Sequence, residues 1–255
     1  MKNSSKKSLF YILIPAFKSA KVLPRTLERI PLEVYKRVEK IVIVEDIDNI
    51  ADKSASHELL KKYSKCHVIY HEKNKGYGAA QKTGYAYCMQ RKCDGVVLLH
   101  SDGQYDPIYL EKFIDEIVNK SMDVVQGSRM RISRMALKGG MPLYKYYLNI
   151  IITYVENKIF NTNYSEFHSG YMAYSKRALN RIPFEKLSNT FHFDGEMLIM
   201  TKLKKLKFKE IAITTYYGEE TSSLNPLSYG FQIIRVVINY IFGRYNINSN
   251  TNRFD

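Results

Sequence analysis

The first half of the chain alternates between short apolar runs and segments with helical spacing. The apolar runs predict strands at Leu9–Ile14, Ile41–Val44, His67–Tyr70, Val96–His100 and Asp123–Gly127. Helical spacing predicts intervening helices at Ala20–Ile30, Lys53–Tyr63, Ala79–Gln90 and Ile108–Asn119. Because strands that alternate with helices in this way form crossover units, the sequence predicts an α/β fold with a mainly parallel, Rossmann-like sheet flanked by helices.

The second half contains two amphipathic patterns. Apolar residues recur at helical spacing over Met141–Phe160 and again over Phe231–Tyr245. Such helices either pack on the sheet or lie in a membrane interface, and the basic flanks and many tyrosines favour the interface. We expect one α/β domain over residues 1–225, an amphipathic C-terminal helix over 226–245 and a disordered polar tail over 246–255.

Charge and cysteine content narrow the class of protein. The chain carries 39 Lys and Arg against 25 Asp and Glu, a formal net charge of +14. This balance favours anionic partners such as nucleotide phosphates, acidic lipid headgroups or nucleic acid, and the alternative is a basic surface that only sets solubility.

The three cysteines form no Cys-x-x-Cys pair, so neither a disulfide framework nor a structural zinc site is expected, and the predicted compartment is the reducing cytoplasm. No apolar stretch approaches the ~18 residues of a membrane-spanning helix.

A polar cluster follows the predicted strand Val96–His100, in the sequence HSDGQYDP. Ligands of open α/β sheets bind where such strands end. His100, Asp102 and Gln104 occupy alternating positions, so their side chains point the same way in an extended segment. Their oxygen and nitrogen atoms suit a divalent cation that in turn holds a diphosphate. The sequence therefore predicts a metal–diphosphate site here.

Two further segments carry candidate ligand-binding residues. Asp46 and Asp48 follow the second predicted strand, where a carboxylate can accept hydrogen bonds from a ribose or base, or alternatively cap a helix. In NKGYGAAQKTG, Gly76 and Gly78 allow close approach to a ligand and Lys82 can meet phosphate, although a plain tight turn is the alternative. The segment lacks the spacing of an ATPase or dehydrogenase loop.

Together these motifs give the chain a family resemblance over roughly residues 9–230. The matching segments, in order, are Pro15-Ala16-Phe17, the acidic residues at 45–48, NKGYGAAQKTG, HSDGQYDP, Gly127-Ser128-Arg129, His168-Ser169-Gly170-Tyr171 and Phe193-Asp194-Gly195-Glu196. In this order they resemble glycosyltransferase family 2, the GT-A fold group that includes dolichyl-phosphate mannose synthase-like enzymes. The resemblance implies a nucleotide-diphosphate-sugar donor, a divalent metal, Mn²⁺ or Mg²⁺, and inversion at the sugar carbon.

The resemblance also implies roles for individual residues. The nucleotide pocket would be lined by Pro15, Phe17, Asp46, Asp48, Asn74, Gly76, Gly78 and Lys82. Asp102, with Gln104, would take the metal that bridges the donor diphosphate. The first Asp of the family's Asp-x-Asp motif is replaced by His100, a softer ligand that suits Mn²⁺ better than Mg²⁺. His100 either binds the metal or only orients Asp102.

The acceptor decides which further residues take part in catalysis. An acceptor hydroxyl needs a general base, for which Asp194 or Glu196 are candidates. A lipid phosphate is already ionised and needs cations instead. Arg129, with the basic loop that follows it, can clamp such a phosphate, although a solvated basic face is the alternative.

The preferred interpretation is a metal-dependent inverting glycosyltransferase that uses a polyprenyl phosphate acceptor at the cytoplasmic face of a membrane. The alternatives are the same donor with a hydroxyl acceptor on a cell-surface glycan, and a non-catalytic sugar-nucleotide-binding module. Nucleic acid is not among the partners that this interpretation implies. The apolar helix faces would meet either lipid or a second copy of the chain.

Overall fold

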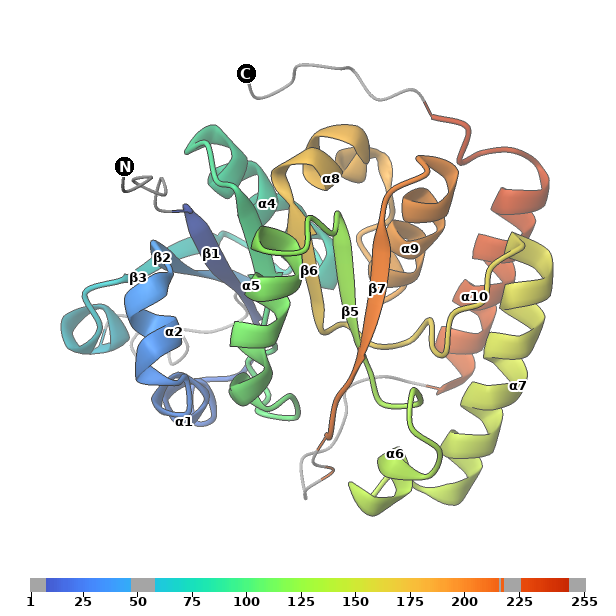
Figure 1. Ribbon diagram of the computed structural model, residues 1–255, viewed down its shortest axis with the longest axis horizontal. Coiled ribbons are helices and arrows are strands. Elements are labelled where there is room, and N and C mark those ends of the chain that lie inside the picture. Colours follow the sequence, from blue (N-terminus) through green and yellow to red (C-terminus); the bar gives the residue numbers. More distant parts are fainter. Residues whose placement is uncertain (1–7, 47–57, 216, 218–225, 248–255) are drawn as a thin grey trace.

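A seven-stranded sheet forms the centre of the protein, in the order β3-β2-β1-β4-β6-β5-β7 (Figure 1). The computed structural model describes residues 8–46, 58–215, 217 and 226–247. The strands are β1 Phe10–Ala16, β2 Lys40–Asp46, β3 Cys66–His71, β4 Gly95–Leu98, β5 Val124–Ser128, β6 Met172–Ser175 and β7 Phe208–Ala212. The pairs β1–β2, β2–β3, β1–β4 and β5–β7 are parallel, whereas β6 runs antiparallel between β4 and β5.

Helices cover both faces of the sheet, which is why the central strands are almost entirely apolar (Figure 1). One face carries α1 Leu23–Glu28, α2 Leu32–Arg37 and α5 Leu110–Val118. The other carries α4 Tyr77–Gln90, α8 Lys176–Arg181 and α9 Phe193–Leu203. At the β5–β7 side lie α6 Met135–Lys138, α7 Leu143–Phe160 and α10 Pro226–Ile241; short 3-10 turns cover Pro107–Tyr109 and Phe184–Lys186.

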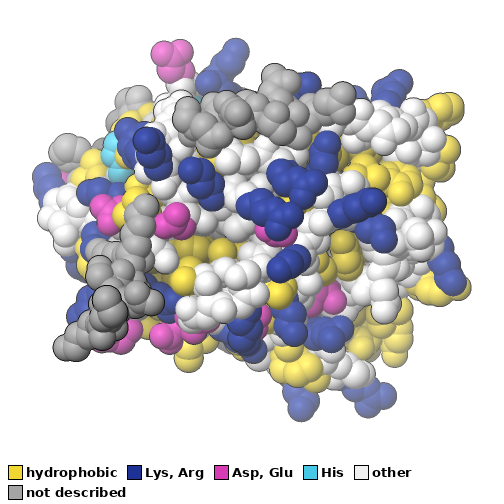
Figure 2. Space-filling model, turned by 45° about the horizontal axis from the view of Figure 1, so that its top comes forward, with side chains coloured by type: hydrophobic (Ala, Val, Ile, Leu, Met, Phe, Trp, Pro, Cys, Tyr) yellow, Lys and Arg dark blue, Asp and Glu magenta, His cyan; other side chains and the backbone are white. Residues whose placement is uncertain are grey.

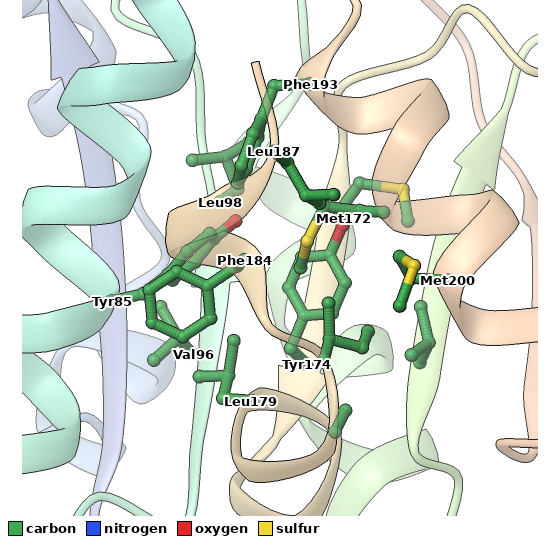
Figure 3. Close-up of a cluster of buried hydrophobic side chains, with 14 of the residues drawn as sticks. Tyr85, Val96, Leu98, Met172, Tyr174, Leu179, Phe184, Leu187, Phe193 and Met200 are labelled. Carbon is green, nitrogen blue, oxygen red and sulfur yellow. The ribbon is translucent and has the colours of Figure 1, made fainter. Parts of the chain in front are cut away.

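Aromatic packing fixes the two helices that carry candidate site residues. Tyr85 of α4 lies against Tyr174 of β6 and Phe193 of α9, with ring centroids 5.5 and 6.4 Å apart (Figure 3). All three side chains are fully buried. Because aromatic side chains bury large areas in defined geometries, this cluster sets the spacing between the middle of α4 and the start of α9.

Close approach of α4 to the sheet depends on Gly84. A Cβ at this position would overlap the fully buried Leu13 side chain of β1. We expect Gly84→Ala to lower the free energy of unfolding by about 1–3 kcal/mol, because an overpacked core must shift to make room. Chemical denaturation measures this. Gly230→Ala is the control: Gly230 lies in α10, and among the described residues no atom beyond the adjacent helix backbone lies within 4 Å of the added carbon, so stability should hold or rise. Equal losses in both variants would contradict the account.

The predicted α/β order is confirmed for the first half, with several corrections. The helix predicted at Ala20–Ile30 is present as the shorter α1, and α2, which begins after Pro31, was not predicted. The fourth strand ends at Leu98, so His100 lies in the following turn. The antiparallel β6 was not predicted. Of the helix predicted at Lys53–Tyr63, residues 58–62 are helical and the rest lies outside the described residues.

The predicted C-terminal helix is present as α10, but it ends at Ile241 rather than at Tyr245. The chain then turns, and Tyr245 is buried. α10 packs against α7, so the two amphipathic helices are neighbours (Figure 1). Among the described residues, no helix is both long and apolar enough to cross a bilayer. The tail beyond residue 247 lies outside the described residues.

Candidate active site

The candidate residues gather where neighbouring parallel strands end. β2 ends at Asp46, β1 at Ala16 and β4 at Leu98, two residues before His100. These three strands are adjacent in the sheet, so the segments that follow them share one edge. Phe17 is partly exposed there, whereas Pro15 is buried within β1 beside Val44. Of these two predicted pocket residues, only Phe17 therefore offers its side chain to a ligand.

Asp46 fixes the loop that precedes α4. Its Oδ1 accepts hydrogen bonds from the backbone N–H of Lys75 at 2.7 Å and meets Nδ1 of His71 at 2.8 Å. Its Oδ2 accepts from the N–H of Gly76 at 2.7 Å, and Asn74 Oδ1 accepts from the same N–H at 3.0 Å. The carboxylate thus shapes the glycine loop beside the predicted nucleotide pocket. Asp48 lies outside the described residues.

Lys82 joins α4 to the segment that leads into α9. Its ammonium group donates to the carbonyl oxygens of Glu185 and Leu187 and to Oδ1 of Asn189. The N–H of Gly78 donates to the carbonyl of Asn189 at 2.9 Å. Burial lowers the pKa of Lys82. A phosphate contact, as the sequence predicts for Lys82, would require this side chain to leave its present partners.

The predicted metal ligands lie in the turn after β4. Oδ1 of Asp102 accepts from the N–H of Gln104 at 3.0 Å, which holds the carboxylate at the start of the turn. Within the described part of the chain, no group of three or more His, Cys, Asp or Glu is close enough to hold a metal. Mg²⁺ and similar ions are often bound by one or two carboxylates, with substrate phosphates supplying other ligands. The carboxylate of Asp102, the amide oxygen of Gln104 and the imidazole of His100 fit a divalent ion that is bound in this way.

His100, Tyr77 and Asp194 meet in a hydrogen-bonded junction. The Tyr77 hydroxyl lies 2.7 Å from Nε2 of His100 and donates to Oδ2 of Asp194 at 2.7 Å. Gln81 donates to the other oxygen, Oδ1, at 2.9 Å. Burial raises the pKa of Asp194, and the hydrogen bonds from Gln81 and Tyr77 and the nearby His100 oppose this rise. Burial and the charge of Asp194 also raise the pKa of Tyr77 well above its usual range, so the hydroxyl keeps its proton.

The second acidic candidate, Glu196, lies on a different face of α9. Residues two apart on a helix do not face the same way. Oε1 of Glu196 accepts from the Tyr245 hydroxyl at 2.8 Å, and Oε2 accepts from the N–H of Ser188 at 2.7 Å. Glu196 therefore fastens the chain after α10 and the loop before α9. The structure brings Asp194, and not Glu196, to His100.

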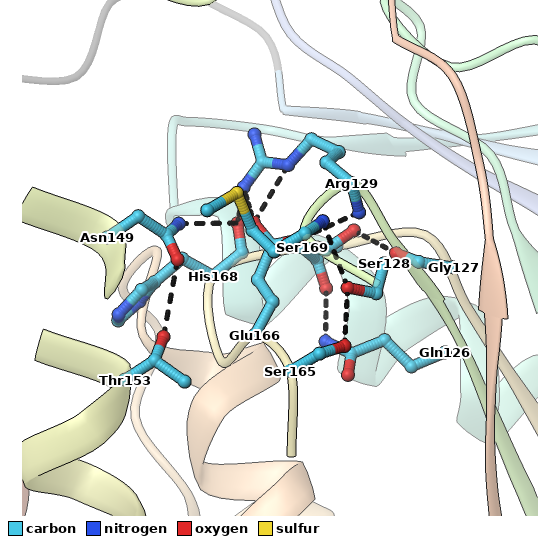
Figure 4. A network of polar contacts seen from close by, with 12 residues as sticks. Gln126, Gly127, Ser128, Arg129, Asn149, Thr153, Ser165, Glu166, His168 and Ser169 are labelled. Atoms are coloured by element: carbon cyan, nitrogen blue, oxygen red, sulfur yellow. Dashed lines mark hydrogen bonds and ion pairs between the residues drawn. The ribbon is translucent and has the colours of Figure 1, made fainter. Parts of the chain in front are cut away.

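Arg129 follows β5 and is bound inside the protein (Figure 4). Its guanidinium donates to the fully buried carboxylate of Glu166, to the carbonyl of His168 at 2.7 Å and to the Tyr217 hydroxyl at 2.7 Å. Asn149 of α7 donates to the same carboxylate at 3.2 Å. Arg129 thus ties together three separate segments, and its donors are directed inward.

Sequence reasoning missed Tyr77 and Glu166. Tyr77 lies within the glycine-rich motif, but no spacing rule pairs it with His100, 23 residues later, or with Asp194, 117 residues later. Glu166 stands beside the predicted motif at His168. No local pattern marks Glu166, which stands between Ser165 and Phe167, and its role shows only in its contact with Arg129, because a buried charge requires a partner.

Comparison with known proteins identifies the family of this chain. Residues 11–182 match the sequence profile of glycosyl transferase family 2. The chain belongs to glycosyltransferase family 2. It is a glycosyltransferase with the GT-A fold, as the motifs predict.

Relatives of this glycosyltransferase include proteins of similar length. An uncharacterized protein of Methanocaldococcus jannaschii is 31% identical over 94% of this chain and 96% of its own. The UDP-N-acetylglucosamine–dolichyl-phosphate N-acetylglucosaminyltransferase of Methanococcus voltae is 27% identical over 83% of this chain and 87% of its own. Glucosyl-3-phosphoglycerate synthase of Mycobacterium tuberculosis, solved with Mn²⁺, UDP and phosphoglyceric acid, has a TM-score of 0.65 at 14% identity, covering 95% of this chain and 80% of that one.

Proposed function

We propose that this glycosyltransferase moves a sugar from a nucleotide-diphosphate donor to a polyprenyl phosphate at the inner face of a membrane. The choice of acceptor rests on one observation: both acidic side chains that could act as a base are hydrogen-bonded within the protein. Asp194 is buried with both oxygens bonded to Gln81 and Tyr77, and Glu196 is bonded to Ser188 and Tyr245. A hydroxyl acceptor needs a base, whereas an ionised phosphate does not. The Methanococcus voltae relative is named for a dolichyl-phosphate acceptor.

The donor would lie at the strand ends, with its diphosphate near Asp102. Asp102 and Gln104 supply oxygen ligands and His100 a nitrogen ligand to the divalent ion. When bound, that ion stabilises the negative charge that develops on the leaving diphosphate. Phe17 and the loop held by Asp46 would border the nucleotide. Direct displacement by the acceptor phosphate inverts the sugar carbon.

An exposed apolar surface supports the membrane part of the proposal. We call the outward-facing side chains of α7 and α10 the apolar helix face; they are Leu143, Tyr144, Tyr147, Leu148, Ile150, Ile151, Tyr154, Val155, Phe231, Ile234, Ile238 and Ile241. Between the helices lies an apolar groove of about 260 Å³. Contiguous exposed apolar surface of this kind is rare on soluble monomers and marks an interaction site.

Basic side chains border the apolar helix face. Arg131, Arg134 and Lys138 are exposed in the segment between β5 and α7, and Lys145 and Arg235 are exposed on the helices themselves. In Figure 2, Lys and Arg spread over one face of the molecule and hydrophobic side chains gather toward the right margin, the side of α7 and α10 in Figure 1. Basic residues next to amphipathic helices are attracted to anionic lipid headgroups. This combination favours a membrane over a second copy of the chain.

Donor and acceptor can be tested together. Purified protein is incubated with a panel of radiolabelled sugar nucleotides, Mn²⁺ or Mg²⁺ and a lipid extract, and the mixture is partitioned into organic solvent. We expect one donor to label the organic phase in a metal-dependent reaction. Label that enters only a water-soluble glycan would favour the hydroxyl acceptor. No turnover or hydrolysis of any donor with either metal would support the non-catalytic binding module and contradict the proposal.

Membrane binding can be tested through α10. We expect the double variant Phe231→Ser, Ile241→Ser to lose at least half of its sedimentation with anionic phospholipid vesicles, because each side chain contributes about 1.5–3 kcal/mol when buried in apolar surroundings. Leu32→Ser is the matched control, since Leu32 is 64% exposed on α2, away from this face. The membrane proposal is wrong if wild-type protein does not sediment with vesicles and is a dimer that the α10 substitutions convert to a monomer. The apolar helix face would then bind a second copy of the chain.

A further inference from the structure

The junction of His100, Tyr77 and Asp194 fixes the direction of its hydrogen bonds. A tyrosine hydroxyl carries one proton, and in this junction it goes to Asp194. The 2.7 Å contact between the Tyr77 oxygen and Nε2 of His100 is then a hydrogen bond only if Nε2 carries a proton and donates it. In a neutral imidazole with its proton on Nε2, the lone pair available to a ligand is on Nδ1.

The ring of His100 is also held sterically. Its edge meets the Tyr105 ring at a centroid distance of 4.8 Å, and Tyr77 stacks on Phe191 at 5.4 Å. A Cβ at Gly170 would lie 2.5 Å from Nε2 of His100, 2.7 Å from the Tyr77 oxygen and 2.8 Å from Oδ2 of Asp194. The junction therefore fits only against a residue without a side chain. Among the described residues, no hydrogen bond or ion pair involves Nδ1 of His100.

We propose that Tyr77, anchored by Asp194, is a positioning residue that presents Nδ1 of His100 to the divalent ion of the donor diphosphate. Histidines that bind metals usually donate their other ring N–H to an acceptor, which fixes the tautomer and the ring orientation. Here the acceptor is the hydroxyl oxygen of Tyr77, which itself donates to the buried carboxylate of Asp194. Asp194 thus supports the metal site through Tyr77 rather than acting on the acceptor. The inference rests on the proposed function, because it requires a metal-bound donor.

The tautomer can be measured without any ligand. Long-range ¹H–¹⁵N NMR of the protein labelled at its six histidines distinguishes protonated from unprotonated ring nitrogens, and the His100→Gln spectrum assigns the His100 signals. We expect a protonated Nε2 and an unprotonated Nδ1, and a mixture of tautomers in Tyr77→Phe. Tyr174→Phe, the control, removes a buried hydroxyl without a hydrogen-bond partner among the described residues and should leave the signals unchanged. An unprotonated Nε2, or no response to Tyr77→Phe, would overturn the inference.

Metal affinity provides a second readout. Binding of Mn²⁺ with saturating UDP is followed by electron paramagnetic resonance. We expect Tyr77→Phe to weaken binding ~10–100-fold, as loss of such a supporting contact typically does, and to weaken Mg²⁺ binding less. Unchanged affinity in Tyr77→Phe overturns only this inference. If wild-type protein shows the expected tautomer but binds no Mn²⁺, the metal-dependent proposed function fails and takes this inference with it.

Gly170→Ala is an independent variant that leaves every hydrogen-bonding group in place. We expect it to displace the junction, to change the His100 signals and to weaken Mn²⁺ binding at least tenfold. Gly195→Ala is its matched control, because the added carbon meets its nearest atom, Nδ1 of His192, at 3.8 Å, an ordinary contact. If Gly170→Ala leaves the signals and the affinity as in wild type, the junction does not position His100.

Discussion

Replacing Asp102 with Asn is expected to lower the rate of sugar transfer by about 100-fold to 1,000-fold, the usual cost of losing one preorganised electrostatic contact at a reacting centre. Of the three proposed ligands of the divalent ion, Asp102 is the one carboxylate. The change is nearly isosteric, and an amide oxygen can still accept from the N–H of Gln104. The fold should therefore be retained. Initial rates at saturating donor, with circular dichroism as a check on the fold, measure the effect.

Asp115→Asn is the control for this variant. Asp115 lies on α5 and pairs with Arg37 at 2.7 Å on the exposed side of the helix. We expect its rate to stay within about twofold of wild type, since exposed ion pairs contribute little. If Asp102→Asn keeps more than a tenth of the wild-type rate at every metal concentration, the metal site has been assigned to the wrong residue.

Replacing Arg129 with Met is expected to lower the free energy of unfolding by about 3–5 kcal/mol, because it leaves the fully buried carboxylate of Glu166 without its cation. Denaturant unfolding measures the loss. The double variant Arg129→Met, Glu166→Met should recover much of the stability, since replacing both partners of a buried pair is often neutral. Arg177→Met, whose side chain is 57% exposed beside Asp123, should cost at most about 1 kcal/mol.

The same double variant separates two roles of Arg129. The sequence predicts that Arg129 contacts the acceptor phosphate, whereas the structure directs its donors to Glu166, His168 and Tyr217. If the double variant is stable but transfers no sugar, Arg129 acts on substrate. If it is stable and active, Arg129 is a structural residue. If the single variant Arg129→Met loses no more unfolding free energy than Arg177→Met, the buried ion pair between Arg129 and Glu166 does not stabilise the fold.

The strands β1, β2 and β4 were predictable because each is buried on both faces and is built around a continuous apolar run, whereas the edge strand β3 is partly exposed. β6 was not predicted because four residues are too few to show a pattern of apolar and polar positions. Its antiparallel direction depends on its pairing with β4 and β5, which no local pattern reports. α2 was not predicted because its six residues are too few to show a helical period. Boundaries and strand direction thus depended on tertiary packing that no local pattern reports.

For the site, the sequence indicated the segments better than the roles of single residues. The strand-end rule correctly placed Asp46 and the turn around Asp102 at one edge of the sheet. It could not show that the Lys82 ammonium group donates hydrogen bonds to three oxygen atoms of residues 185–189. Nor could it show that Glu196 faces away from Asp194. Hydrogen bonds between residues far apart in the sequence decide these roles.

The proposed function depends on the acceptor, which product analysis identifies. The protein is incubated with its active sugar nucleotide, metal and either a purified polyprenyl phosphate or the polyprenol of the same chain length, and products are identified by mass spectrometry. We expect a glycosyl phosphate linked to the lipid from the polyprenyl phosphate and no product from the polyprenol. A glycosylated polyprenol, or no product from the phosphate with a donor that the protein turns over, would contradict it.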